Sequence, residues 1–349
     1  MDRFERAVGE AVGAPYAVAT ATGTAALHIA LIIGGVEPED EVIVSALSFI
    51  APANAIRYVG AWPLFVDADP NYGQMDPQCL ADTLRDKCAW QKGALRNRRT
   101  GRRVRAIMPV HILGHSVDLD PILDLAHQHE LVVIEDAAEA FGARYRDRPV
   151  GRPTDLACLS FNGNKTVTAG GGGTVVANRP DWAERARYLT TQAKNDADEY
   201  VHHEIGFNYR LTNLQAALGL SQVEALDAHV EAKRRIASKY AEQLAGADCL
   251  DVIREAPWAR SSCWLSAIRL NDRAANLDCR MLNRRLKQRH IETRLLWQPL
   301  SRSPAHAAVA PDPCPVADRH AERTLCLPSS VGLDDDEINY VCASIHDQL

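Results

Sequence analysis

One lysine of the sequence stands in a setting that suits covalent chemistry. Lys165 lies in the segment SFNGNKTVTAGGGG, shortly before four consecutive glycines, Gly170 to Gly173. Glycine allows turns and close approaches that other residues resist, so the chain around Lys165 can pack tightly. A lysine partly removed from water in such a cleft can form a Schiff base with a carbonyl group. A structural lysine beside a glycine-rich turn is the alternative from these residues alone.

Two acids and a serine are placed to serve the same site. Asp136 ends the apolar run LVVIED, so we expect it at the carboxyl end of a buried strand, where α/β folds bind ligands. Its carboxylate could pair with a protonated ring nitrogen, or it could cap a helix. Glu139, one helical turn further, could face this site or solvent. Ser160 could donate its hydroxyl to a phosphate or bond to backbone within its strand.

A third feature suits an anion. Thr22, Gly23 and Thr24 lie between AVATA and the helical run AALHIAL. Free N–H groups and the positive end of the dipole at a helix start favour a phosphate, and threonine hydroxyls add donors. The same triplet could simply cap the helix.

The surrounding pattern predicts the elements that would position these groups. Short β-branched runs alternate with helical spacing through the first two thirds, which indicates an α/β domain with a mostly parallel sheet. Asp136 and Lys165 follow successive expected strands, which would bring them to one edge of that sheet. We expect strands at 41–45, 62–67, 104–111, 131–136, 156–161 and 173–177, and helices at 24–33, 51–58, 76–84, 119–128 and 182–189.

The last third changes character. A long helical stretch over 213–244 leads to an expected strand at 263–270 and a helix at 276–289. This pattern predicts a small α+β domain at 229–349 after a large domain at 1–228. A basic stretch at 87–103 is typical of a surface hairpin, with contact to a nucleotide diphosphate or a neighbouring subunit as the alternative.

Composition excludes several classes of protein. The nine cysteines are scattered without a CxxC pair, which argues against disulfides or a zinc site and favours a reducing cytoplasm. The formal charge of −6 gives no general attraction to nucleic acid. The start, MDRFERAVGEAVG, has no signal-peptide core, and no apolar run is long enough to span a membrane. The histidine pairs only superficially match metal motifs, so we expect no metal site.

Several motifs together resemble the DegT/DnrJ/StrS family of sugar aminotransferases. The resemblance covers nearly the whole chain, and the family normally carries a further N-terminal segment with a Gly-Trp turn near the substrate. It implies a pyridoxal 5'-phosphate (PLP) enzyme of the aspartate-aminotransferase-like fold, called fold type I, acting as a homodimer with composite active sites. The motifs are TGTAAL (22–27), IEDAAEAFGA (134–143), SFNGNKTVTAGGGG (160–173) and GFNYRLTNLQAALGLSQ (206–222).

Carried onto this sequence, the resemblance assigns a role to each candidate. Lys165 would form the covalent link to PLP and Asp136 would pair with the pyridine nitrogen, with Glu139 beside the cofactor. Gly23, Thr24 and Ser160 would hold the phosphate. Two further residues come from the resemblance alone: Phe49 would stack on the ring, and Asn208 would reach the phosphate from the other subunit.

Details narrow the expected substrate. The family's common Gly-Glu-Gly-Gly has Gly171 at its acidic position here, and FNGNK with GGGG resembles the branch that makes UDP-linked 4-amino sugars for bacillosamine and legionaminic acid. This resemblance implies transfer from glutamate to C4 of a UDP-4-keto-6-deoxy-N-acetylhexosamine for polysaccharide or lipopolysaccharide biosynthesis. A GDP- or TDP-4-keto-6-deoxysugar aminotransferase, similar to perosamine synthases, is the alternative.

Other functions fit less well. A sugar dehydratase of the same fold would carry histidine in place of Lys165. A non-catalytic regulatory member of the fold stays open at this point. A Rossmann dehydrogenase would need GxGxxG after its first strand, which this sequence lacks.

Overall fold

The fold is built on a seven-stranded sheet in the order β1-β11-β10-β7-β6-β2-β3. The computed structural model describes residues 1–152, 154–195, 199–274, 277–309 and 312–349. The strands from β10 to β3 run parallel, whereas β11 is antiparallel to both β1 and β10. The expected mixed, mostly parallel sheet is therefore confirmed. Its strands are β1 (Tyr16–Thr20), β2 (Glu41–Ser45), β3 (Trp62–Val66), β6 (Val104–Met108), β7 (Val132–Asp136), β10 (Leu156–Ser160) and β11 (Gly173–Ala177).

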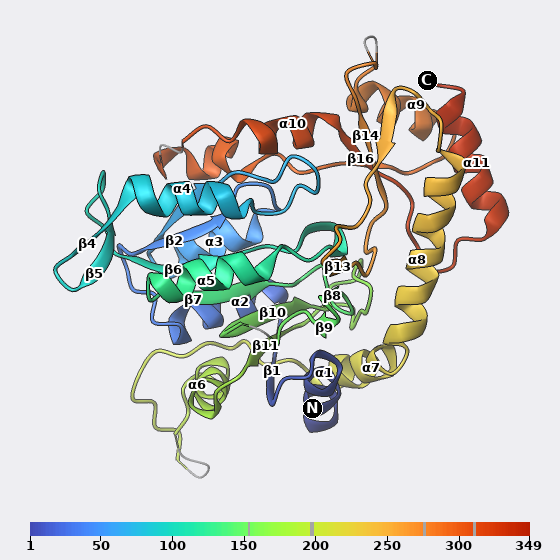
Figure 1. Ribbon diagram of the computed structural model, residues 1–349. Coiled ribbons are helices and arrows are strands. Elements are labelled where there is room, and N and C mark those ends of the chain that lie inside the picture. The colour runs from blue at the N-terminus through green and yellow to red at the C-terminus, as the bar shows by residue number, and fades with distance from the viewer. Residues whose placement is uncertain (153, 196–198, 275–276, 310–311) are drawn as a thin grey trace.

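Helices cover both faces of this sheet (Figure 1), and every residue of β2, β7 and β10 is buried. One face packs against α2, α3 and α6. The opposite face packs against α4 and α5 over one half and against α1 and α7 over the other. Their bounds are α1 (Asp2–Val12), α2 (Gly23–Ile33), α3 (Ala51–Tyr58), α4 (Pro77–Lys87), α5 (Leu119–Gln128), α6 (Pro180–Thr190) and α7 (Asn213–Val223).

A second, antiparallel sheet in the order β12-β14-β16-β15 forms the core of the last third. Helices α8, α9 and α11 pack on it and bury a separate apolar cluster. The predicted domain boundary at 228/229 falls inside α8, and the division into two domains stays a prediction. The elements are α8 (Leu226–Gln243), β12 (Leu250–Val252), β14 (Ala267–Leu270), α9 (Cys279–Gln288), β15 (Arg294–Leu295), α10 (Pro315–Arg323), β16 (Thr324–Cys326) and α11 (Asp335–His346).

Three expected elements of the last third differ from the structure. The helix predicted over 213–244 is broken between α7 and α8, because α7 packs against α1 and α8 against the small sheet. A Cβ on Gly219 of α7 would lie 2.7 Å from the Phe4 ring, which shows how closely the first of these contacts is made. The strand expected at 263–270 begins only at Ala267, after Cys263 adopts a φ of 50°. The expected helix at 276–289 begins at Cys279, and position 276 lies outside the described residues.

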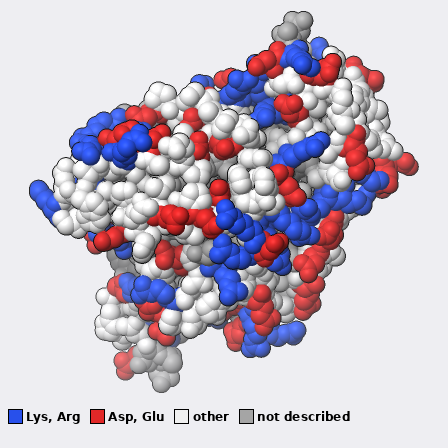
Figure 2. Space-filling view, viewed as in Figure 1, with Lys and Arg blue, Asp and Glu red and all other residues white. Residues whose placement is uncertain are grey.

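The basic stretch forms the expected hairpin, from β4 (Cys88–Gln91) and β5 (Ala94–Asn97). Its flanking cations pair with acids: Arg103 with Asp40 at 2.6 Å and Lys87 with Asp312 at 2.9 Å. Acidic and basic side chains also alternate over the visible surface (Figure 2). A short sheet of β8 (Arg144–Tyr145), β9 (Arg148–Pro149) and β13 (Ala259–Arg260) completes the fold. Within the described ranges, no helix has the length and apolarity that a membrane span requires.

Candidate active site

A pocket of about 420 Å³ opens at the carboxyl ends of the parallel strands. Segments that follow β2, β6, β7 and β10 form one side, the first turn of α2 forms another, and residues near β14 to β16 close it. In a parallel sheet these strand ends share one edge, which explains why residues far apart in the sequence meet here. The lining includes Thr22, Gly23, Thr24, Ser48, Phe49, Asp136, Glu139, Ser160, Asn164, Lys165, Gly171, Gly172, Trp264 and Arg294.

Lys165 lies in the loop between β10 and β11 with its side chain only 13% exposed. Its Nζ is 3.5 Å from Oε1 of Glu139 and 4.0 Å from the centre of the Trp264 ring. The Trp264 indole N–H donates to the carbonyl oxygen of Asn164 at 2.7 Å. The amine is therefore held between a carboxylate and an aromatic face.

Asp136 is buried at the end of β7, where its backbone pairs with the segment after β6. Its Oδ1 accepts a hydrogen bond from the N–H of Ala138 at 3.1 Å, the only one that its carboxylate makes among the described residues. Burial raises the pKa of this carboxyl, and the Ala138 bond and the Lys165 charge partly offset that effect. A cationic ligand group against Asp136 would favour its ionised form further.

Glu139 is also buried, and its Oε2 accepts from the backbone N–H of Leu113 at 2.9 Å. Burial raises the pKa of its carboxyl to about 7, although Lys165 and the Leu113 bond act in the opposite direction. Near neutral pH this acid can therefore give up or accept a proton beside Lys165. Leu113 adopts the left-handed region with φ 59°, a conformation that aims its N–H at Glu139.

The first turn of α2 and Ser160 form a cradle for an anion. Thr22 is the N-cap of α2, and its side chain accepts from the Ala25 N–H. A Cβ on Gly23 would lie 2.8 Å from the Cβ of Ser160, so only glycine lets the helix start approach this serine so closely. A Cβ on Gly173 would lie 2.5 Å from the Thr22 carbonyl oxygen, so this last glycine of the run lets β11 approach the helix start.

The two residues expected from the resemblance alone lie in different places. Phe49 is 53% exposed and lines the pocket, which leaves its ring free to contact a ligand. Asn208 is exposed and lies outside the pocket lining, in the segment that leads into α7. This place is compatible with service to another subunit, and that role stays a prediction.

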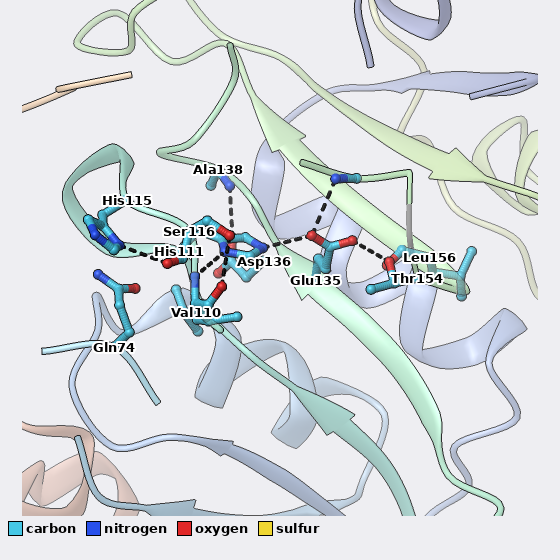
Figure 3. A network of polar contacts seen from close by, with 12 residues as sticks. Gln74, Val110, His111, His115, Ser116, Glu135, Asp136, Ala138, Thr154 and Leu156 are labelled. Atoms are coloured by element: carbon cyan, nitrogen blue, oxygen red, sulfur yellow. Dashed lines mark hydrogen bonds and ion pairs between the residues drawn. The ribbon is translucent and has the colours of Figure 1, made fainter. Parts of the chain in front are cut away.

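A buried network of hydrogen bonds around His111 and Glu135 lies next to Asp136 (Figure 3). His111 Nδ1 accepts from the Val117 N–H at 3.1 Å, so its proton lies on Nε2, which donates to Glu135 at 2.8 Å. Glu135 also accepts from the Gly151 N–H and from the Thr154 hydroxyl. This network holds the loop that carries Leu113, and with it the position of Glu139.

Several pocket residues were not foreseen from the sequence, among them Trp264, Asn164 and Arg294. The sequence places Trp264 in a strand, where an aromatic residue normally indicates core packing. Asn164 is part of the FNGNK segment, but its carbonyl rather than its side chain makes the contact to Trp264. Arg294 of β15 carried no local signal, because only the chain fold brings it to the pocket.

Known proteins share this architecture over almost the whole chain. The chain is 38% identical to a GDP-perosamine synthase of Caulobacter vibrioides over 347 residues, which is 99% of this chain and 89% of that protein. Identity to the GDP-perosamine synthase of Escherichia coli O157:H7 is 34% over 347 residues, with the same shares of 99% and 89%. The crystal structure of S. venezuelae DesV superposes with a TM-score of 0.88 at 30% identity, over 99% of this chain and 88% of that chain.

Fold and pocket thus define a PLP-dependent transferase of the aminotransferase type. The profile of the DegT/DnrJ/EryC1/StrS aminotransferase family matches residues 1–346, and the chain belongs to this family of sugar aminotransferases. The expected family, fold type and cofactor are confirmed. The expected UDP-4-amino-sugar branch stays a prediction, and the names of these two relatives favour its GDP alternative.

The residues present fit PLP by their chemistry. Lys165 is a shielded amine, and Asp136 is a buried carboxylate whose second oxygen has no hydrogen bond within the described part of the chain. The N-terminus of α2 and the Ser160 hydroxyl supply hydrogen-bond donors for a phosphate. The two lie close enough to bind the same phosphate because Gly23 has no side chain.

Proposed function

We propose that this enzyme transfers the amino group of glutamate to C4 of a GDP-linked 4-keto-6-deoxysugar. The main support is that a shielded lysine, a buried carboxylate and a helix start converge in one pocket. Support for the nucleotide is separate: the two relatives above, similar over 99% of this chain, are named GDP-perosamine synthases. The glycine-rich loop led us to expect a UDP-linked sugar, whereas the substrate proposed here is linked to GDP.

Asp136, Lys165 and Glu139 have chemical roles in this proposal. When bound, PLP supplies an aldehyde and an electron-withdrawing ring. Asp136 would stay ionised against the ring nitrogen and keep that nitrogen protonated. Lys165 would carry the proton between the substrate carbon and the cofactor. Glu139, with a pKa of about 7, would exchange a proton with Lys165 during this transfer.

The remaining residues would bind and orient. Thr24, Gly23 and Ser160 would hold the cofactor phosphate, and the exposed ring of Phe49 would cover the pyridine face. These groups exclude water from one side of the pocket and fix the direction from which a substrate approaches.

A homodimer is part of the proposal. Leu214 and Ile205 are each 85% exposed, and both are near Asn208 in the sequence. Ile205 precedes α7, and Leu214 lies in its first turn. Large apolar side chains at such exposure often mark an interface. A second copy that covered this face would bring its Asn208 toward the neighbouring pocket, as the family resemblance implies.

The test is product analysis by mass spectrometry. The purified enzyme with PLP and glutamate is incubated with GDP-, UDP- and TDP-4-keto-6-deoxysugars, and Lys165→Ala serves as the inactive control. We expect amination of the GDP sugar and formation of 2-oxoglutarate in equal amount. Amination of a UDP-linked N-acetylhexosamine alone would support the UDP-sugar substrate that the sequence predicts. No reaction with any of the three sugars would refute the substrate class.

A further inference from the structure

Lys233 of α8 is a buried lysine whose hydrogen bonds go to backbone carbonyls. Its residue is 7% exposed, and its Nζ donates to the carbonyl oxygens of Trp264 at 3.0 Å and Ser329 at 2.8 Å. Among the residues that the structure describes, this ammonium forms no ion pair. Burial lowers the pKa of Lys233 to about 8. Burial of a cation costs free energy unless its N–H donors are hydrogen-bonded. The two bonds therefore hold the backbone at Trp264 and at Ser329 close to α8.

Trp264 connects this cation to the active site. Its carbonyl accepts from Lys233, its indole N–H donates to the Asn164 carbonyl at 2.7 Å, and its ring lies 4.0 Å from Nζ of Lys165. One residue therefore contacts α8 through its backbone and the reactive loop through its side chain. A shift of the Trp264 backbone would move the ring that faces the amine.

The Ser329 segment is fixed in the same way. The Ser329 hydroxyl accepts from the Ser266 N–H at 2.9 Å and donates to the Leu327 carbonyl at 2.9 Å. Tyr240, further along α8, donates its hydroxyl to the Pro328 carbonyl at 2.9 Å. Helix α8 is thus tied at two places to the segment that follows β16.

The two lysines also share a cavity. A space of about 570 Å³, beside the PLP pocket, is lined by Lys165, Lys233, Trp264 and Ser329 among others. Its other titratable or charged lining residues are His229, Glu292, Arg294 and Cys326. Glu292 is 3.5 Å from Arg294, whereas the hydrogen bonds of Lys233 go to backbone carbonyls. The ammonium of Lys233 therefore acts on the site through backbone contacts.

We propose that Lys233 is a positioning residue for Lys165: its ammonium holds the Trp264 backbone to α8 and thereby keeps the indole ring against the reactive amine. The placement of Lys165 then depends on α8, a helix outside the central sheet and its covering layers. This inference rests on the proposed function only in that Lys165 is the reacting amine.

The test reads the reactivity of Lys165 in cofactor-free protein. The protein is labelled with a trace of acetic anhydride, and the label on the Lys165 peptide is measured by mass spectrometry. Lys233→Met removes the charge at similar length. We expect Lys165 to label about threefold faster, the size expected for loss of one cation–π contact, because the indole ring no longer lies against its amine. Lys239→Met, on the same helix but paired with Asp335 at the surface, should leave the rate unchanged.

A double-mutant cycle separates positioning from a general loss of stability. Trp264→Leu keeps the carbonyl that Lys233 bonds but removes both the indole N–H and the aromatic face at Lys165. If Lys233 acts through Trp264, Lys233→Met should change the labelling of Lys165 little further in the Trp264→Leu background. If Lys233→Met does not fold by circular dichroism, Lys233→Gln, which keeps an N–H donor, enters the same cycle.

Two results would overturn the inference. They are unchanged Lys165 labelling in folded Lys233→Met protein, and fully additive effects in the cycle. Failure of the GDP-sugar assay would leave this result intact, since labelling needs neither cofactor nor substrate. A Lys165→Ala enzyme with unchanged turnover would instead remove the proposed function.

Discussion

Two neighbouring acids of β7 point to opposite faces of the sheet and have opposite surroundings. Glu135 faces the closed network, where it accepts bonds from His111 at 2.8 Å, from the Gly151 N–H at 3.2 Å and from the Thr154 hydroxyl. Asp136 faces the pocket, where its carboxylate accepts only the Ala138 N–H among the described residues. Both acids are buried. Successive strand residues alternate in direction, so one position along the chain separates a structural acid from a candidate catalytic one.

The contrast shows how to tell such acids apart. Buried polar groups are normally satisfied within the protein, and Glu135 follows this rule. Asp136 and Glu139 have few internal bonds, and burial raises the pKa of both carboxyls. Buried acids with raised pKa values at a strand-end pocket indicate that a ligand supplies the remaining contacts.

The largest effect is expected on the pocket side, from Lys165→Ala. Loss of the amine removes both the attachment point of the cofactor and the group that carries the proton, so turnover should fall by at least about 10³-fold. Steady-state assays and the visible absorbance of the PLP-loaded protein measure this loss. Lys239→Ala, on the surface of α8, is the matched control and should behave as wild type. Residual activity within tenfold of wild type in Lys165→Ala would contradict the assignment.

The next pair of variants tests the comparison directly. Asp136→Asn should lower kcat by about 10²–10³-fold with little loss of stability, because a neutral amide cannot hold a ring nitrogen protonated. Glu135→Gln should destabilise the fold by about 1–3 kcal/mol, because its amide nitrogen must face either the donors of His111 and Gly151 or the Thr154 hydroxyl. Urea unfolding and kcat per folded molecule distinguish the two outcomes. If kcat per folded molecule fell equally in both variants, Glu135 could not be distinguished from Asp136 as a purely structural acid.

A smaller effect should appear in the pH dependence of stability. The carboxyl of Glu139 keeps its proton in the folded chain up to a pKa of about 7, whereas its ordinary value is 4.5. Between these values the folded state holds more protons than the unfolded state, so stability decreases as pH rises through this window. The contribution is on the order of 1–3 kcal/mol. Thermal unfolding of cofactor-free protein from pH 4.5 to 7.5 measures it.

The control for that experiment is Glu139→Gln, which cannot titrate. Its unfolding temperature should vary less across the same window than that of wild type. Parallel curves for the two proteins would show that Glu139 titrates at its ordinary value.

The smallest effect is expected at the anion cradle. Gly23→Ala places a Cβ 2.8 Å from that of Ser160, so the helix start must move away from the serine. We expect about tenfold weaker binding of PLP and a loss of about 1–3 kcal/mol in stability. Gly332→Ala, where an added Cβ meets nothing within 4 Å, is the control. Equilibrium dialysis of PLP checks the affinity, and unchanged binding in Gly23→Ala would argue against a phosphate at this position.

The sequence alone determined the parts of this protein that local pattern encodes. The strand at 41–45 and the helices at 51–58 and 119–128 have their predicted bounds, because the spacing of apolar residues and the turn residues at their ends are local properties. It also placed Asp136 and Lys165 at the ends of successive strands, from which a shared sheet edge follows. The multi-motif resemblance then identified the family correctly, whereas its nucleotide differs from that of the two GDP-perosamine synthases.

Only the tertiary structure decided what surrounds these groups. Trp264 and Arg294 reach the pocket through a sheet far along the chain, and no local pattern encodes that approach. Likewise Lys233 reads as one more cation on an amphipathic helix until packing buries it against two carbonyls. The break between α7 and α8 has the same origin, since helical periodicity continues through it while the packing partners change. Burial and contact partners depend on the whole fold, and they set the pKa values and hydrogen bonds on which the chemistry depends.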